Sequence, residues 1–238
     1  MTVDIHAHVV PGLDDGPRTF AEADALLRNF REAGVDDVIC TPHYLHPLFD
    51  LDLITICTAF DDLVEVTPPD DAWPHLHLGA EVRLTKALID DLRWMTVPTL
   101  AGTSSVLVEL PSRGFGDAEL ELIHELVVRG YQPILAHPER NLSIQKQPER
   151  VRDLTRLGVR MQLTASAFIA ASQNAEDRTF GRAPKSADSP TVRTAQWIIA
   201  HGYADFVASD AHDTVLRTPC DAKWLCGIEL SREGCTRA

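Results

Sequence analysis

The stretch Asp4-Ile5-His6-Ala7-His8, near the start of the chain, contains the first residues that could do chemistry. Its two histidines are spaced i, i+2 after a short apolar run. In an extended chain both imidazoles therefore lie on the same face of the strand and can bind one metal ion together. A His-x-His pair alone is a weak signal. It gains weight here because later apolar stretches also end in residue types that bind metals, namely His43, Glu81, Glu109, His137, Asp210 and His212.

These eight candidate ligands offer nitrogen and carboxylate oxygen but no cysteine, a set that suits zinc, manganese or iron. Eight ligands exceed the needs of one ion, so we predict two or three divalent ions with a bridging carboxylate. Each residue alone could be an ordinary polar residue, but half of the ten histidines fall at predicted strand ends. The other half are assigned elsewhere or left open: His75 and His77 at a strand entry, His124 and His201 on helices, and His46 without a role.

Two arginines follow candidate ligands closely in the sequence. Arg140 comes three residues after His137, and Arg217 comes seven residues after Asp210. A guanidinium can bind two phosphate oxygens at once, so both arginines could hold a phosphoryl group beside the metal ions. Each alone could equally be a solvated surface residue.

Apolar stretches alternate with helical patterns along the chain, and this order predicts a parallel sheet. The clearest helix signal is the capping box of Thr19 and Glu22, with Gly34 as the stop. We predict strands at residues 3–5, 37–41, 75–81, 105–110, 132–136, 159–164 and 205–208. Further helices are predicted at residues 53–64, 85–92, 117–129, 148–157 and 190–201.

About seven strand–helix units can close into a barrel, whose active site lies at the carboxyl ends of the strands. The candidate ligands are predicted to lie there. The composition shows no shift along the chain, so we expect a single domain over residues 1–238, which is long enough for a full core. Residues 172–189 are polar, with Gly and Pro, and are expected to form a long loop.

The formal net charge of −13 argues against a nucleic-acid partner or an anionic membrane surface. An anionic substrate would need local positive charge from metal ions or arginines. The cysteines are odd in number and include no Cys-x-x-Cys pair, so we expect reduced thiols and a cytoplasmic protein. No stretch has the pattern of a signal peptide or a membrane span, so no membrane insertion is expected.

Taken in order, several stretches resemble the polymerase-and-histidinol-phosphatase (PHP) superfamily. Within it, the resemblance is to the metal-dependent protein-tyrosine phosphatases of bacterial capsule and exopolysaccharide operons. It spans residues 4–212. The segments that carry it are Asp4-Ile5-His6-Ala7-His8, Pro11-Gly12-Leu13-Asp14-Asp15-Gly16, Thr41-Pro42-His43, Gly79-Ala80-Glu81, Ala136-His137-Pro138-Glu139-Arg140 and Ala208-Ser209-Asp210-Ala211-His212.

The resemblance implies an α/β fold, a distorted seven-stranded β/α (TIM-like) barrel of PHP type, with two or three divalent ions. Manganese is the first choice, and iron and zinc are alternatives. It implies hydrolysis of phosphotyrosine in a protein, with a bacterial tyrosine kinase as the expected partner. A metal-bound hydroxide would attack phosphorus in line, while Arg140 and Arg217 stabilise the transferred group. His43, His137 or Asp14 could protonate the leaving oxygen, and the sequence does not choose among them.

The chain departs from the family pattern in three places. The predicted loop at residues 172–189 is longer than the corresponding loop of the family, and the stretch after His43 is shorter. Residues 219–238 match poorly and are expected to be a diverged or truncated tail. These departures lie outside the candidate ligands.

Other functions remain open. A small-molecule phosphatase, for example for histidinol phosphate, would have much the same metal site. A metal-dependent amidohydrolase typically has a bridging lysine and a further histidine where this chain has Glu109 and Thr164. A non-catalytic scaffold would not need all the candidate ligands.

Cys226 and Arg232 have the spacing of cysteine-dependent phosphatases, but Glu229 would repel phosphate and no strand is predicted before that loop.

Overall fold

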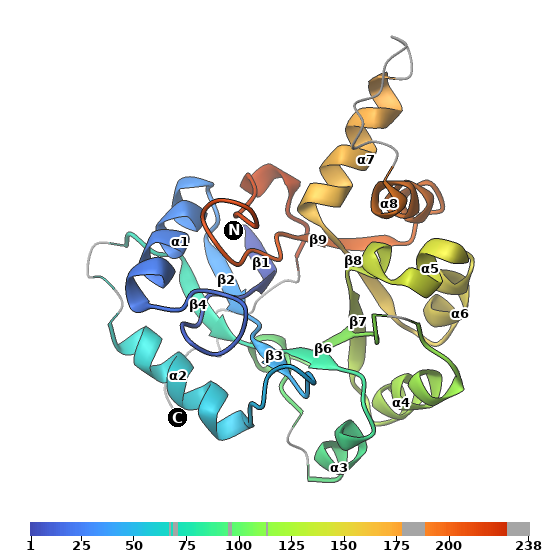
Figure 1. Cartoon of the computed structure of the whole chain (residues 1–238), viewed down its shortest axis with the longest axis horizontal. Helices are drawn as coiled ribbons and strands as arrows, with labels where there is room; N and C mark the ends of the chain where they lie inside the picture. Colours follow the sequence, from blue (N-terminus) through green and yellow to red (C-terminus); the bar gives the residue numbers. More distant parts are fainter. Residues whose placement is uncertain (67, 69–70, 95–96, 113, 178–188, 228–238) are drawn as a thin grey trace.

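The strands line the inside of the molecule and the helices cover its outside (Figure 1). The computed structural model describes residues 1–238 apart from 67, 69–70, 95–96, 113, 178–188 and 228–238. The strands of the described residues are β1 (Val3–Ala7), β2 (Asp37–Cys40), β3 (His43–Tyr44), β4 (His75–Leu78), β5 (Glu81–Arg83), β6 (Ser105–Glu109), β7 (Gln132–Ala136), β8 (Arg160–Thr164) and β9 (Ala204–Ala208).

Helices follow most of the strands. The capping box predicted at the start of α1 is confirmed, because the Thr19 hydroxyl accepts from the Glu22 N–H and the Glu22 carboxylate accepts from the Thr19 N–H. The helices are α1 (Phe20–Glu32), α2 (Leu53–Glu65), α3 (Ala87–Trp94), α4 (Asp117–Val128), α5 (Leu142–Lys146), α6 (Arg150–Arg156), α7 (Ala165–Asp177) and α8 (Pro190–Ala200). Short 3₁₀ turns are η1 (Leu100–Gly102), η2 (Pro138–Arg140) and η4 (Ala222–Trp224).

The described strands form two parallel sheets rather than the one closed barrel that the sequence led us to expect. One sheet has the order β1-β2-β4, and the other has the order β3-β5-β6-β7-β8-β9. The single strand predicted over residues 75–81 is wrong, since β4 pairs with β2 whereas β5 pairs with β3 and β6. The break falls at Gly79, where a Cβ atom would lie only 2.8 Å from Ile39 Cγ2 and 3.0 Å from Leu100 Cδ2.

Backbone hydrogen bonds connect the two sheets at their carboxyl ends. The N–H of Asp210, just after β9, donates to the carbonyl of His6 at 2.9 Å, and the His8 N–H donates to the carbonyl of Ala211 at 2.9 Å. At the other junction the Glu81 N–H donates to the Pro42 carbonyl at 3.1 Å. The strand ends of both sheets are thereby brought to one region.

An apolar cluster inside the ring of strands supports this region. It is built from alternate residues of β1, β2, β6, β7 and β9, with Leu100 of η1. Burying each branched side chain contributes roughly 1.5–3 kcal/mol relative to exposure. Two members, Ile5 and Ala136, directly precede the candidate ligands His6 and His137, so the packing of the core fixes the backbone positions of these two ligands. The cluster consists of Val3, Ile5, Ile39, Leu100, Leu107, Ile134, Ala136, Phe206 and Ala208.

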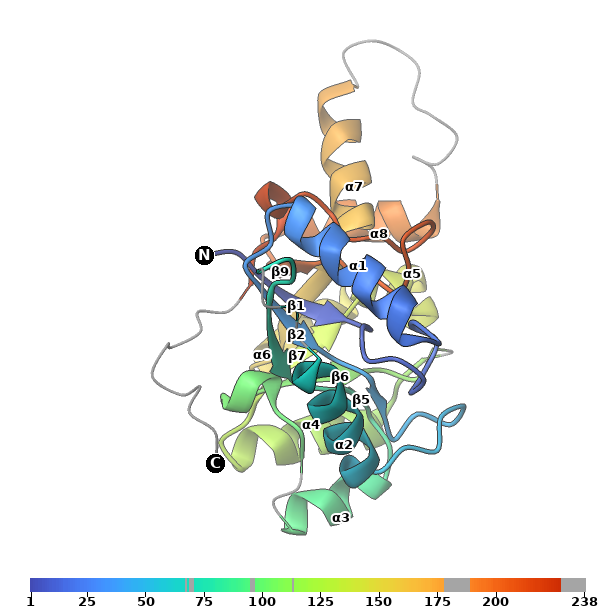
Figure 2. The ribbon, with the colours of Figure 1, turned by 90° about the vertical axis from the view of Figure 1, so that its left-hand side faces the viewer.

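The long loop expected at residues 172–189 is wrong for its first part, because α7 continues to Asp177. Its alanine-rich sequence favours a helix directly after β8. Residues 178–188 lie outside the described residues, and Ser189 is the N-cap of α8, where its side chain accepts from the Val192 N–H. Figures 1 and 2 both show α7 projecting beyond the other helices.

Two smaller differences concern short elements. Helix α5 was not predicted, although the Asn141 side chain caps it by accepting from the N–H groups of Ser143 and Ile144. In the predicted tail, η4 and a bridge between Val207 and Cys226 are described, and residues 228–238 lie outside the described part. Among the described helices, none has both the length and the apolar character that a membrane span requires.

Candidate metal centre

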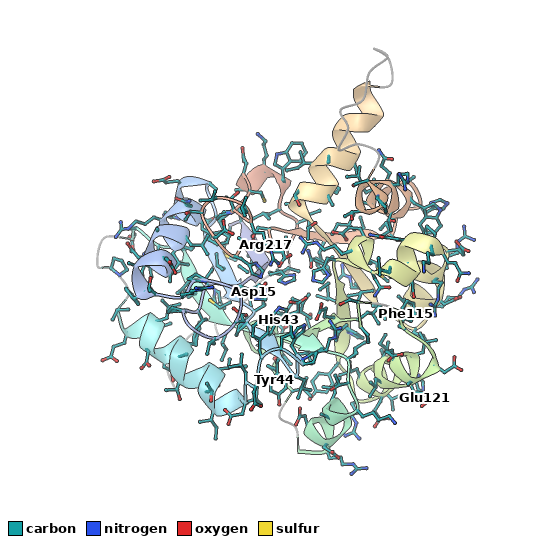
Figure 3. All side chains as sticks on the ribbon, viewed as in Figure 1. Asp15, His43, Tyr44, Phe115, Glu121 and Arg217 are labelled. Atoms are coloured by element: carbon teal, nitrogen blue, oxygen red, sulfur yellow. The ribbon has the colours of Figure 1, made fainter. Side chains whose placement is uncertain are left out.

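The candidate ligands gather where the strands end, near the centre of the ring in Figure 3, where Asp15, His43 and Arg217 lie close together. His6 and His8 come from the end of β1. The bonded pair Asp4↔Val38 is followed by Ala7↔Cys40, so β1 has one more residue than β2 in this interval. Such a bulge re-aims side chains next to a site. The two Nε2 atoms converge to 3.3 Å.

Partners behind the two imidazoles fix which nitrogen faces the site. Gln162 donates from Nε2 to the carbonyl of Leu163, so its Oε1 points at His6 Nδ1, 2.9 Å away. Asp14 Oδ2 lies 2.7 Å from His8 Nδ1. Both Nδ1 atoms therefore donate, and both Nε2 atoms face the centre. This arrangement is typical of histidines that bind metals.

The carboxylate of Glu81, at the start of β5, lies among four histidines. Its Oε2 is 3.5 Å from His6 Nε2, 3.4 Å from His8 Nε2 and 3.1 Å from His43 Nδ1. Its Oε1 is 2.7 Å from His137 Nε2. The carboxylate is fully buried, and imidazole nitrogens lie next to both of its oxygens.

Asp210 and His212 reach the centre from the segment after β9. Asp210 Oδ1 lies 3.3 Å from His6 Nε2, and Asp210 adopts a left-handed backbone with φ of 54°. His137 shares this conformation, with φ of 34°. Left-handed conformations of residues other than glycine cost roughly 1–3 kcal/mol each and cluster at functional sites. Both residues were predicted ligands.

Both predicted arginines bond to Asp210. Arg140 Nη1 lies 2.6 Å from Asp210 Oδ2, and Arg217 Nη2 lies 2.9 Å from both Asp210 oxygens. Arg217 Nη1 also donates to Asp15 Oδ2 at 3.0 Å. Each arginine side chain is about a third exposed. Both line a cavity of about 400 Å³ together with His43, Glu81, Glu109 and His137.

Asp15 is the site residue that the sequence reading missed, since only its neighbour Asp14 was named. Asp15 Oδ1 lies 3.1 Å from His212 Nε2 and 3.6 Å from His43 Nε2. Asp14 instead accepts hydrogen bonds from His8 and from the His43 backbone. The turn packs tightly against β1, because a Cβ atom on Gly16 would lie 2.7 Å from the His8 carbonyl. The paired aspartates in the loop were the available signal.

Glu109, at the end of β6, is shared between the site and an unpredicted arginine. Arg83 Nη1 lies 2.6 Å from Glu109 Oε2, and Arg83 Nη2 donates to Ser112 Oγ at 3.5 Å. Both carboxylate and guanidinium are largely buried. Arg83 therefore holds Glu109 at the edge of the centre, within reach of His43 and Glu81.

The described residues contain four groups whose ligand atoms lie within 4.8 Å of one another, the spacing that a bound cation needs. Seven of the eight predicted ligands occur in them, and His137 does not. Buried His43 Nδ1 and His212 Nε2 each lie 3.1 Å from a carboxylate oxygen, of Glu81 and of Asp15, so nitrogen and oxygen donors suited to a divalent ion are paired here. The groups are His6, His8 and Glu81; His8, Asp15 and His43; His8, Asp210 and His212; and His43, Glu81 and Glu109.

The close packing of carboxylates and imidazoles shifts the pKa values of several residues in the centre. Burial opposes charge on His137, but Glu81 and Asp210 outweigh it and raise the pKa of His137 to about 9. The pKa of His8 is likewise raised above its usual value, because Asp14 and Glu81 outweigh burial. The pKa of Glu81 is lowered, since the neighbouring imidazoles outweigh its burial. The centre thus attracts positive charge, as protons or as metal ions.

Other expected positions are consistent with roles away from the centre. His124 is exposed on α4, and His201 is the C-cap of α8. His77 Nε2 bonds Asp37 at 2.8 Å at the opposite end of the strands. Cys226 is exposed, and its Sγ lies 3.6 Å from the Asp205 carbonyl, while Arg232 lies outside the described residues.

Parallel strands whose carboxyl ends carry clustered histidines and carboxylates define an α/β protein with a candidate metal site. The comparison with family models specifies it further. The model described as "Capsular polysaccharide synthesis, CpsB/CapC" matches residues 2–225, so the chain belongs to the CpsB/CapC family.

Curated relatives cover most of the chain. The putative tyrosine-protein phosphatase CapC of Staphylococcus aureus is 29% identical over 215 residues, which are 90% of this chain and 78% of the relative. The tyrosine-protein phosphatase YwqE of Bacillus subtilis strain 168 is 28% identical over 90% of this chain and 79% of its own. The tyrosine-protein phosphatase CpsB of Streptococcus agalactiae is 27% identical over 91% of this chain and 85% of its own.

Solved structures share the fold. A structure from work on YwqE of Bacillus subtilis and CpsB of Streptococcus pneumoniae, described as unique metal-dependent tyrosine phosphatases, matches with a TM-score of 0.79. It is 26% identical and covers 93% of this chain and 83% of its own. A putative histidinol phosphatase from Listeria monocytogenes, 11% identical, matches with a TM-score of 0.52 over 88% of this chain and 95% of its own, and shows the fold alone.

Metal binding should release protons. At neutral pH the raised pKa values keep His8 and His137 protonated in the metal-free protein. A divalent ion needs neutral imidazole and also neutralises Glu81, so binding should expel these protons and strengthen as the pH rises toward about 9. Calorimetric titration with Mn²⁺ in buffers of different ionisation enthalpy would count them. A pH-independent affinity without proton release would contradict this account.

Asp15→Asn should weaken metal binding. The amide keeps the shape of the side chain but lacks the charge next to His43 and His212, and we expect an affinity loss of about 10–100-fold or more. The matched control is Asp61→Asn, an exposed position on α2. Metal content by elemental analysis after dialysis would measure both variants. If Asp15→Asn retained as much metal as Asp61→Asn, Asp15 would have no part in metal binding and would serve only to bond Arg217.

Proposed function

We propose that this protein is a metal-dependent phosphomonoester hydrolase that removes phosphate from phosphotyrosine in proteins. One observation supports this most: a cavity of about 400 Å³ is lined both by candidate metal ligands and by the two arginines. Membership of the CpsB/CapC family and the relatives that are tyrosine-protein phosphatases point the same way.

The charges in this cavity suit a phosphate dianion. Divalent cations held by the four ligand groups would supply Lewis acidity and a water of lowered pKa. Arg140 and Arg217 would each offer paired N–H donors to the phosphoryl oxygens that gain charge during transfer. Their partial exposure leaves donor atoms available at the cavity.

The candidates for protonating the leaving oxygen differ in position. His43 and His137 line the cavity, so both are retained for this role. Asp14 is engaged by His8 Nδ1 and by the N–H groups of Gly16 and His43, and its pKa is lowered to about 2 because His8 outweighs its burial. We therefore assign Asp14 to orienting His8.

The metal identity and the number of ions belong to the proposal. We propose two or three ions with manganese preferred, and iron or zinc as alternatives, because the four groups share His8, His43 and Glu81 and offer only nitrogen and oxygen. Glu81 would bridge. His137 is proposed as a ligand or proton donor that acts next to this bridge.

We also propose that the two sheets together represent a distorted seven-stranded barrel of PHP type. Support comes from chain continuity, since β2 leads into β3 and β4 leads into β5 with only two residues between them. The Ala7↔Ala211 bridge places the end of β1 beside the segment after β9. If β2 with β3 and β4 with β5 are each counted as one interrupted strand, the nine described strands become seven, and their carboxyl ends surround the site.

The physiological substrate we propose is a bacterial tyrosine kinase that regulates capsule or exopolysaccharide synthesis. The family description supports the pathway, and the relatives' names support the phosphotyrosine. A cytoplasmic location fits the cysteines, because the four described ones, Cys40, Cys57, Cys220 and Cys226, are all free thiols.

Catalysis should depend on metal and not on thiol. Cys226 is exposed and does not line the cavity, so Cys226→Ser should keep near-normal hydrolysis of a phosphotyrosine peptide. EDTA should abolish that hydrolysis, and Mn²⁺ should restore it. Steady-state rates with and without chelator test this. Loss of activity in Cys226→Ser, or a trapped phosphocysteine, would overturn the proposal.

Arg140→Ala should lower kcat/KM for a phosphotyrosine peptide by about 10²-fold, roughly 2.7 kcal/mol, the scale for losing one preorganised donor. Arg140→Lys should recover little, because an ammonium cannot hold two oxygens in the same geometry. Arg156→Ala is the control, since this exposed arginine on α6 pairs with Asp153 and does not line the cavity.

The metal content of the Arg140 variants decides the interpretation. Retained metal with lower kcat/KM would assign Arg140 to the phosphoryl group. Lost metal would mean that it acts by holding Asp210, and kinetics equal to those of Arg156→Ala would remove it from the site.

A further inference from the structure

Three aromatic rings in mutual contact form one wall of the cavity, next to the metal centre. The ring of His43 stacks on that of His46, with centroids 4.5 Å apart and planes at 27°, and on that of Phe49, 5.1 Å apart at 11°. The rings of His46 and Phe49 are 5.2 Å apart. All three belong to the segment that begins at β3, where sequence reasoning had left His46 without a role.

The backbone holds this segment in a defined shape. Leu45 adopts a left-handed conformation with φ of 58°, which is costly for a branched residue. The turn after it is closed by the Phe49 N–H donating to the His46 carbonyl at 3.1 Å. The Leu48 N–H donates to His46 Nδ1 at 3.3 Å, and His46 Nε2 lies 4.0 Å from Glu109 Oε2. The aromatic wall is therefore tied to a candidate ligand.

The lining of the cavity is chemically mixed. Candidate ligands and the two arginines suit a phosphoryl group. The apolar part of the lining includes Leu48, Phe49, Leu110, Leu135 and Pro138. Leu48 is 80% exposed and lines this cavity, so its side chain is accessible to a bound peptide.

We propose that Phe49 and His46 contact the aromatic ring of the phosphorylated tyrosine and set a preference for aryl over alkyl phosphates. This inference rests on the proposed function and specifies how the substrate is selected. Aromatic rings prefer offset-stacked or edge-to-face contacts with centroids about 4.5–7 Å apart, the same spacing that the wall already uses. Leu48 then covers the peptide next to the tyrosine.

The test compares two peptides of identical sequence, one with phosphotyrosine and one with phosphoserine, hydrolysed by the Mn²⁺-loaded protein. The measured quantity is the ratio of their kcat/KM values. A general disturbance of the metal centre lowers both values and leaves the ratio unchanged. A lost contact with the aryl ring lowers only the phosphotyrosine value.

Phe49→Leu should lower this ratio about tenfold, because it keeps apolar bulk but loses the ring. Phe49→Tyr should keep the ratio within about twofold, since it restores the ring. Ile54→Ala is the matched control, an exposed apolar residue on α2 that does not line the cavity. Leu48→Ala should raise KM for the peptide and leave its kcat nearly unchanged.

The outcomes separate the two proposals. Wild-type hydrolysis of phosphotyrosine with an unchanged ratio in Phe49→Leu would overturn the aromatic wall and keep the phosphatase. Absence of wild-type hydrolysis of either peptide would overturn both. A tenfold fall of the ratio in Phe49→Leu that Phe49→Tyr reverses would support the wall.

Discussion

Buried negative charge at the carboxyl ends of the strands is the constraint on which the structure depends. Glu81 and Asp210 are almost fully buried, and burial alone would strongly disfavour their ionised forms. Their pKa values are nevertheless lowered, because imidazoles and guanidinium groups surround them. For Glu81 the neighbours that lower the pKa are His6 and His137, and for Asp210 they are His6, His137, Arg140 and Arg217. Divalent ions would replace part of this compensation, so the fold and the metal site are linked by charge as well as by position.

Local backbone devices place the donors against this charge. The bulge in β1 brings the Nε2 atoms of His6 and His8 together, and the left-handed conformations of His137 and Asp210 turn their side chains inward. None of these devices is favourable by itself. They are held because the strands behind them are anchored in the apolar core, and because the bond from the Asp210 N–H to the His6 carbonyl ties the two ligand segments together.

Periodicity and position explain what could be predicted from the sequence. Long apolar runs with clear stops, such as those ending at His43 and His137, gave the parallel strands, and residue type at their ends gave seven members of the ligand groups. The split at Gly79 could not be predicted, because it depends on contacts with Ile39 and Leu100 from other elements. Asp15 was missed because adjacent aspartates in a loop look alike until the fold shows which one faces His212.

The position of Asp210 connects the two halves of the proposed chemistry. Its Oδ1 faces His6 and accepts from Arg217, and its Oδ2 accepts from both arginines. A phosphoryl group that engages the arginines and an ion that engages the carboxylate would therefore both change the partners of the same side chain. Metal binding and phosphate binding are not independent at such a residue, since each changes the charge that the other meets. The aromatic wall extends the same logic, because Phe49 and His46, which we propose to contact the tyrosine ring, stack on His43, a candidate ligand of the centre.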